Sequence, residues 1–124
     1  MGSTFGGGPL AFAAAAEIAS RFDEVVELPA DIARAAESAA ACRLDALLYT
    51  DIGMEPFTYF LAHSRLAPVQ WVTWGHPVTT GISTIDAYLS PDCFEADGAE
   101  AHYAERLVRS PSIPMNYRDE HVPP

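Results

Sequence analysis

Residues 69–81 read VQWVTWGHPVTTG. The first six are mostly β-branched or aromatic, which favours a strand, and the last seven begin and end with glycine, which favours a loop. Upstream, residues 45–50 contain the run ALLY, typical of a strand buried on both faces of a parallel sheet. Between them, Pro56 suits the first turn of a helix that extends to about Leu66. This order predicts a strand, helix, strand unit.

The flanking sequence extends this alternation in both directions. Upstream we expect a short strand over 22–28 and then an Ala-rich helix from the N-cap Asp31 to Cys42. Downstream we expect a strand over 85–89, a turn at 90–92, a helix over 99–105 and a short strand over 106–109. Strands that alternate with helices imply right-handed connections and a largely parallel sheet. The sequence therefore predicts the α/β fold class.

Length and composition limit the organisation of the chain. Its 124 residues fit one domain, and 49% hydrophobic with 19% charged residues indicates a folded core. We divide it into a Gly/Ala-rich lead-in (1–21), which contains a short helix from about Pro9, the folded α/β region (22–110) and a Pro-rich tail (111–124).

The charge excludes several classes of partner. The formal charge is −10, and all seven basic side chains are arginine. Binding to nucleic acid or to an anionic membrane surface needs clustered positive charge, so we expect neither. No apolar run reaches the roughly 18 residues that span a bilayer, and we expect a cytoplasmic protein.

Familiar catalytic motifs are missing. There is no GxSxG elbow, no GxGxxG after a strand and no P-loop lysine. Cys42 and Cys93 stand far apart without zinc-ligand spacing, so we expect reduced thiols and no metal site.

Candidate site residues follow two predicted strands. Ligands of parallel sheets bind at the carboxyl ends of strands, where both the 51–54 turn and the 75–81 loop fall. Glycines let the backbone approach a ligand, and polar side chains supply hydrogen bonds. Alternatively, the loop is a tight connection whose threonines cap a helix, and the carboxylates of Asp51 and Glu55 serve the turn. The substrate-binding candidates are Asp51, Gly53, Gly75, His76, Pro77, Thr79, Thr80 and Gly81, with His76 also a candidate catalytic residue.

Several linked motifs resemble one enzyme family. They are DALLYTDIGMEP (45–56), RLAPVQ (65–70), WGHPVTTG (74–81), Ile85-Asp86 and HYAERL (102–107). In order and spacing they resemble the catalytic region of bacterial SPINDLY-like proteins and, more distantly, O-GlcNAc transferase. The resemblance covers about half the chain and favours a ligand-binding role for the 75–81 loop.

The resemblance implies a GT-B architecture, in which two Rossmann-like lobes close around a nucleotide sugar, usually UDP-GlcNAc. Such enzymes transfer the sugar with inversion to Ser or Thr hydroxyls of proteins. This chain would be part of the first, acceptor-side lobe, with the 75–81 loop lining the cleft and 51–55 forming a neighbouring wall. No cofactor beyond the UDP-sugar donor is implied.

The chain departs from the family mainly by what it lacks. The donor-binding lobe and its lysine have no counterpart, nor do the upstream histidine-bearing loop and the TPR repeats. The resemblance therefore implies a fragment that is inactive alone and needs a donor lobe or partner chain. The rival hypothesis is a non-catalytic α/β binding module that needs a partner chain. Both predict an exposed apolar face.

Overall fold

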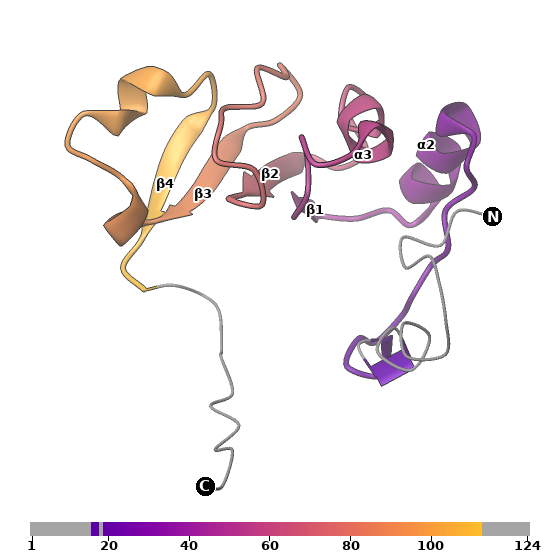
Figure 1. Ribbon diagram of the computed structural model, residues 1–124. Helices are drawn as coiled ribbons and strands as arrows, with labels where there is room; N and C mark the ends of the chain where they lie inside the picture. Colours follow the sequence, from indigo (N-terminus) through magenta and orange to yellow (C-terminus); the bar gives the residue numbers. More distant parts are fainter. Residues whose placement is uncertain (1–15, 18, 113–124) are drawn as a thin grey trace, which may run out of the picture.

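The computed structural model describes residues 16, 17 and 19–112. They form a four-stranded, all-parallel sheet in the order β1-β2-β3-β4 (Figure 1). The strands are β1 (Ala46–Tyr49), β2 (Val69–Thr73), β3 (Ala87–Pro91) and β4 (Arg106–Ser110). The predicted α/β class is confirmed. Most of the predicted helix from Pro9, most of the lead-in and most of the Pro-rich tail lie outside the described residues, although residues 16, 17 and 19 are helical.

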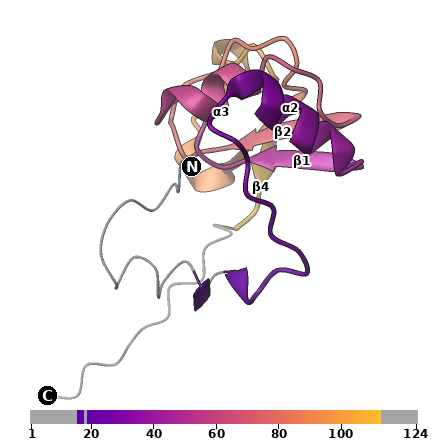
Figure 2. The same ribbon diagram turned by 90° about the vertical axis from the view of Figure 1, so that its right-hand side faces the viewer.

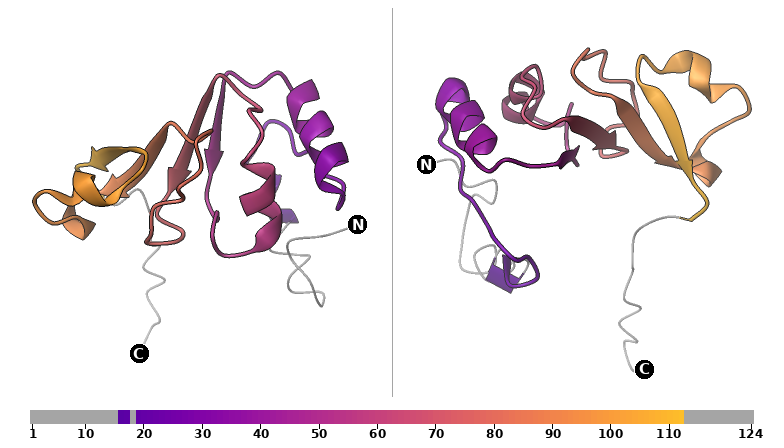
Figure 3. Two further views of the ribbon diagram at one scale, coloured as in Figure 1. Left: turned by 90° about the horizontal axis from the view of Figure 1, so that it is seen from above. Right: turned by 180° about the vertical axis from the view of Figure 1, so that it is seen from behind.

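Two α-helices begin where the sequence places the N-cap Asp31 and the first-turn proline Pro56. In α2 (Ile32–Ala41), the Asp31 carboxylate accepts a hydrogen bond of 2.9 Å from the backbone N–H of Arg34. In α3 (Pro56–Leu61), proline occupies the first turn, where no intrahelical donor is needed. Both helices lie side by side over the β1 and β2 end of the sheet (Figures 2 and 3).

The core follows the strand register. Tyr49, Val72, Tyr88 and Leu107 are partners on adjacent strands and form one row across the sheet. A second cluster, made by Ala35, Ala39, Leu61 and Leu66, joins α2 to α3 and its following turn. Each fully buried aliphatic side chain stabilises the fold by about 1.5–3 kcal/mol. Both α-helices therefore cover the Tyr49 face of the sheet.

The opposite face is only partly covered. Alternation along the strands places Leu48, Trp71, Leu89 and Val108 there. Leu48 is 50% exposed, and the other three are half-buried. The prediction that β1 is buried on both faces is therefore wrong. Parallel sheets normally carry a layer on both faces, so an apolar surface stays open here.

The predicted strand over 22–28 is also wrong. This segment is extended but pairs with no strand among the described residues, and Phe22 and Val25 are exposed. A strand exists only where a neighbour accepts its backbone hydrogen bonds, and β1 pairs with β2 alone in this part of the chain.

Other boundaries differ from the sequence-based expectation. The helix predicted to reach Leu66 ends at Leu61, and the third strand starts at Ala87 and includes Ser90 and Pro91, which were predicted as a turn. The hydrogen-bonded pairing of β3 with β2 stops at Leu89. Because Pro91 lies beyond this pairing, its missing N–H breaks no hydrogen bond to β2.

The connections are less helical than predicted. Only α3 is an α-helical crossover between described strands; an irregular loop joins β2 to β3. Two 3₁₀ turns, η1 (Asp92–Phe94) and η2 (Ala99–His102), join β3 to β4. The helix predicted over 99–105 stops at His102, because the backbone N–H of Ala104 bonds to Thr79 Oγ1 instead.

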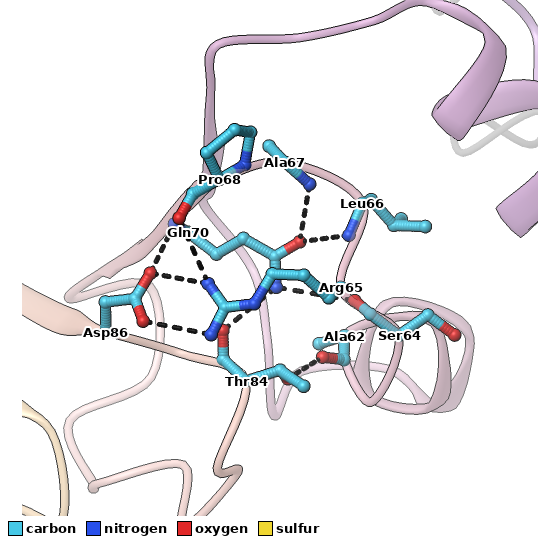
Figure 4. Close-up of polar contacts among 9 residues, drawn as sticks. All are labelled: Ala62, Ser64, Arg65, Leu66, Ala67, Pro68, Gln70, Thr84 and Asp86. Carbon is cyan, nitrogen blue, oxygen red and sulfur yellow. Dashed lines mark hydrogen bonds and ion pairs between the residues drawn. The ribbon is translucent and has the colours of Figure 1, made fainter.

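A buried glutamine organises the amino-terminal edge of the sheet (Figure 4). The Gln70 side chain is fully buried, and its Oε1 accepts from the backbone N–H groups of Leu66 (2.7 Å) and Ala67 (3.2 Å). Its Nε2 donates to the carbonyl oxygens of Ser64 and Thr84. One amide thus ends the α3 connection and holds the approach to β3.

A carboxylate extends this cluster to the surface. Asp86 Oδ2 accepts from the backbone N–H of Gln70 at 2.8 Å, and both carboxylate oxygens bind the Arg65 guanidinium at 2.7 and 3.0 Å. The guanidinium and this N–H lower the pKa of the Asp86 carboxyl. Because the ion pair is about 40% exposed, we attribute the rigidity of this edge mainly to Gln70.

We predict that Gln70→Leu destabilises the chain by about 2–4 kcal/mol, because it leaves buried backbone donors and acceptors without partners. Urea unfolding followed by circular dichroism measures the change. Arg65→Met, which removes the exposed ion pair and one long hydrogen bond to the Pro68 carbonyl, serves as the control and should cost clearly less. Equal stability of Gln70→Leu and the parent chain would contradict this account.

Candidate functional site

Two glycines bring the loops after β1 and β2 into contact. A Cβ atom on Gly75 would lie 1.9 Å from the backbone oxygen of Thr50, so only glycine permits this approach. A Cβ on Gly53 would lie 2.9 Å from the ring of His76, and Gly53 has φ 97°. Both glycines therefore sit at the carboxyl edge of the parallel sheet, as the sequence predicts.

This contact places four of the predicted site residues together. Asp51 and Gly53 follow β1, Gly75 and His76 follow β2, and the His76 ring packs on Gly53. Asp51 is half-buried and Gly53 is exposed. The result is an edge with one carboxyl and one imidazole beside accessible backbone.

The pKa of Asp51 is raised above its ordinary 3.8. Burial is the main cause and the nearby charge of Glu55 adds to it, while a backbone hydrogen bond opposes them. A raised pKa makes a carboxylate a better proton acceptor, so this environment suits a general base.

Glu55 takes the structural role. Its Oε2 accepts from the backbone N–H of Phe57 at 2.8 Å and its Oε1 from that of Thr58 at 2.7 Å, which caps α3. Burial raises the pKa of Glu55, but these hydrogen bonds outweigh it and the pKa is lowered. The carboxylate stays charged and holds the helix start beside the site.

The rest of the 75–81 loop is anchored by a residue that sequence reasoning did not select. Thr79 Oγ1 donates to Glu105 Oε2 at 2.6 Å, and the backbone N–H of Thr80 donates to Glu105 Oε1 at 2.8 Å. The Thr80 hydroxyl also donates to Oε1. We call these three residues the Glu105 cluster. The helix-cap alternative for the threonines is replaced by this contact.

The Glu105 cluster is buried and charged. Glu105 is only 6% exposed, and burial raises its pKa, but the donors from Thr79 and Thr80 lower it below the ordinary 4.5. Both hydroxyl hydrogens are therefore used within the chain, and substrate binding by Thr79 and Thr80 stays a prediction. The only signal in sequence was the position of Glu105 within the HYAERL motif.

The remaining predicted residues have distinct settings. Gly81 has φ 66° and open space around its Cα, so its backbone conformation alone explains the glycine. Pro77 is exposed and, with Trp74, lines a cavity of about 290 Å³ beside the loop. The carbonyl of His76 accepts a hydrogen bond from the Tyr88 hydroxyl, which fixes the backbone between Gly75 and Pro77.

Metal and membrane features are absent from the described residues. No group of three or more His, Cys, Asp or Glu side chains within residues 16–17 and 19–112 is arranged to hold a metal ion. Over the same residues, no helix is long and apolar enough to cross a bilayer. Cys42 and Cys93 are free and exposed cysteines.

Comparison with known proteins gives a partial match. No family model matches the chain. It is similar to two proteins named UDP-glucose:protein N-beta-glucosyltransferase from Actinobacillus pleuropneumoniae, one from serotype 7 (strain AP76) and one from serotype 5b (strain L20). Identity is 38% and 36% over 66 residues, which is 53% of this chain. The chain spans only about 10% of the length of these relatives.

These relatives support the expected likeness to protein glycosyltransferases. Their names specify glucose and an N-linked product, whereas the sequence motifs resemble O-GlcNAc transferase and SPINDLY-like proteins. The sugar and the linkage therefore stay predictions.

We predict that Gly75→Ala destabilises the chain by about 3 kcal/mol, because its methyl group overlaps a backbone oxygen that cannot move independently. Gly81→Ala is the control. It meets no neighbouring atom and should cost only about 1 kcal/mol for its left-handed backbone. Urea unfolding of both variants tests the difference, and a Gly75→Ala cost no larger than that of Gly81→Ala would contradict the contact.

We also predict that Glu105 makes stability depend on acid pH. Its folded pKa lies below its unfolded value near 4.5, so its contribution is complete above pH 4.5 and is lost as pH falls through the folded pKa. Glu105→Gln should flatten this acid limb in urea unfolding measured from pH 6 downward. The exposed Glu37→Gln serves as the charge-matched control, and an unchanged limb in Glu105→Gln would refute the assignment.

Proposed function

We propose that this chain forms part of a glycosyltransferase that moves a sugar from a UDP-sugar to a polypeptide side chain. The observation that carries the proposal is the similarity to two protein glucosyltransferases over 66 residues. The joined loops after β1 and β2 supply a suitable place, because parallel sheets bind ligands at this edge.

The chain contributes the acceptor side of the cleft in this proposal. Asp51 acts as the general base that takes the proton from the attacking acceptor group, since burial raises its pKa. His76, packed on Gly53, orients the acceptor or the sugar through its ring nitrogens. The exposed backbone from Gly75 to Pro77 approaches the sugar closely.

A second lobe or partner chain supplies the cation for the leaving group. Departure of a nucleoside diphosphate develops negative charge that needs a nearby cation or helix start. The sequence has no lysine, and three of its arginines form ion pairs among the described residues: Arg21 with Glu17, Arg65 with Asp86 and Arg109 with Asp92. The donor site is therefore proposed to lie outside this chain, which is inactive alone.

The donor and the linkage have two specific candidates. The names of the relatives favour UDP-glucose and a nitrogen acceptor. The resemblance to O-GlcNAc transferase favours UDP-GlcNAc and Ser or Thr hydroxyls. One peptide assay with both donors, and with acceptors containing Asn or Ser, separates them.

A non-catalytic binding module is the competing function. The open apolar face around Leu48 and Trp71 favours a partner layer, although the same face is expected of one lobe of a larger enzyme. Transfer activity in the assay below decides between them.

We predict that the chain transfers sugar only when it is joined to a donor-binding lobe, a protein that we call the extended protein. In the extended protein, Asp51→Asn should lower kcat by about 10²–10⁴, as expected for loss of a general base. The rate should fall on the acid side at a pH above the ordinary 3.8 of aspartate, because the base must be deprotonated. Transfer of radiolabelled sugar to peptide measures both.

Asp45→Asn provides the matched control. It makes the same charge change just before β1, at the opposite end of that strand, and should leave kcat unchanged. No transfer by the extended protein with either donor, while it remains folded, would refute the enzyme proposal and favour the binding module.

A further inference from the structure

An aromatic cavity lies beside the candidate site. Its volume is about 290 Å³, and its walls include Trp74, Tyr88, Phe94 and Tyr103. It lies between the end of β2, the middle of β3 and the 3₁₀ segment that follows β3. This is at the small end of ligand pockets, which span roughly 300–1,000 Å³, so it fits one side chain and not a nucleotide.

The rings of this cavity are held in place by their polar ends. The Tyr88 and Tyr103 rings lie 4.7 Å apart with a tilt of 54°. The Tyr88 hydroxyl donates to the His76 carbonyl, and the Tyr103 hydroxyl donates to Glu95 Oε1 at 2.7 Å. Both hydroxyl hydrogens are therefore used within the chain, and because Tyr88 is only 1% exposed, the cavity offers a ligand the more accessible rings of Trp74, Phe94 and Tyr103. Phe94, 55% exposed, stands at the rim.

A carboxylate with one oxygen free to accept hydrogen bonds lines the same cavity. Glu95 Oε1 accepts from both Ser90 Oγ (2.6 Å) and Tyr103, whereas Oε2 has no hydrogen-bond partner among the described residues. Glu105 adds a second negative charge nearby. The pKa of Tyr88 is raised to about 12, mainly by burial and further by the charges of Glu95 and Glu105. The cavity is therefore negative.

The Arg109 guanidinium does not neutralise this carboxylate. Arg109 binds Asp92 through Nε at 2.7 Å and Glu100 through a terminal nitrogen at 3.5 Å. Its contact with Glu95 is to the backbone oxygen, at 2.8 Å. Aromatic faces together with an unneutralised carboxylate attract an organic cation and gain little from a neutral ligand.

We propose that this cavity binds the guanidinium or ammonium end of an arginine or lysine side chain from the acceptor polypeptide. Trp74 and Pro77 belong both to the cavity wall and to the segment around the 75–81 loop, so a bound basic residue would lie beside the acceptor site. The net charge of −10 favours the same ligand. This inference rests on the proposed function for its biological role, but the binding itself can be measured without it.

The test titrates the 124-residue chain with Nα-acetyl-arginine amide and, separately, with the neutral isostere Nα-acetyl-citrulline amide. NMR follows the Trp74 indole N–H, assigned with a Trp71→Phe variant, and the Tyr103 ring signals. We expect saturable shifts with the arginine compound and about three- to thirty-fold weaker binding of the citrulline compound. Equal binding of the two, or no saturation by either, would overturn the proposal.

Two variants locate the binding in the cavity. Glu95→Gln keeps an acceptor for Ser90 and Tyr103 but removes the charge, and should weaken arginine binding about three- to thirty-fold. Glu100→Gln removes an equal charge from an exposed side chain outside the cavity wall and should leave binding unchanged. If Glu95→Gln does not fold, Phe94→Ala at the rim should still weaken binding measurably. Saturation of the same signals by glucose instead of arginine would refute a cation site.

The outcome is separable from that of the proposed function. Arginine binding with no transfer by the extended protein leaves the cavity assignment standing and removes the enzyme. Transfer with no arginine binding supports the enzyme and removes the cavity assignment. If both hold, replacing an arginine near the acceptor residue by citrulline should raise KM of the peptide and leave kcat nearly unchanged.

Discussion

The buried amide of Gln70 is the contact on which the arrangement of this sheet depends. It satisfies backbone groups from the turn after α3 and from the loop before β3, while its own backbone bonds to Asp86. The alternative to these contacts is a set of buried, unpaired polar groups, each costing about 1–3 kcal/mol. This one side chain therefore sets where α3 must end, where β2 begins and how β3 is approached, and so directs both strands toward a common carboxyl edge.

At that carboxyl edge, two glycines permit contacts that any side chain would block. Gly75 lets its loop touch the Thr50 carbonyl, and Gly53 lets the His76 ring lie on the backbone after β1. The Glu105 cluster then ties the far end of the loop to the segment before β4. The 75–81 loop is therefore held at both ends. Asp51, His76 and the backbone from Gly75 to Pro77 remain as the groups that could contact a ligand. This pre-organisation suits the acceptor wall of the proposed transferase.

The site and the aromatic cavity share one short segment of chain. Trp74 and Pro77 line the cavity, and the His76 carbonyl between them holds the Tyr88 hydroxyl. A ligand in the cavity would therefore contact the same loop that meets the substrate in the proposed function. The open apolar face of the sheet, with Leu48 half exposed, lies on the opposite side from the cores around α2 and α3. In the proposed function, substrate recognition and contact with a further layer would therefore use different surfaces.

The sequence by itself determined the parallel α/β class, the N-cap of α2, the proline in the first turn of α3, strands β1, β2 and β4, and the placement of Gly53 and Gly75 at one edge. These features depend on local propensity, on proline and cap chemistry and on strand direction, all of which are readable within a few residues. Only the tertiary structure decided that 22–28 is not a strand, that Glu105 binds both threonines and that Gln70 ends the α3 connection. Each of these depends on whether a distant backbone or side chain supplies a hydrogen-bond partner, and residues 25 positions apart in sequence carry no local signal of their contact.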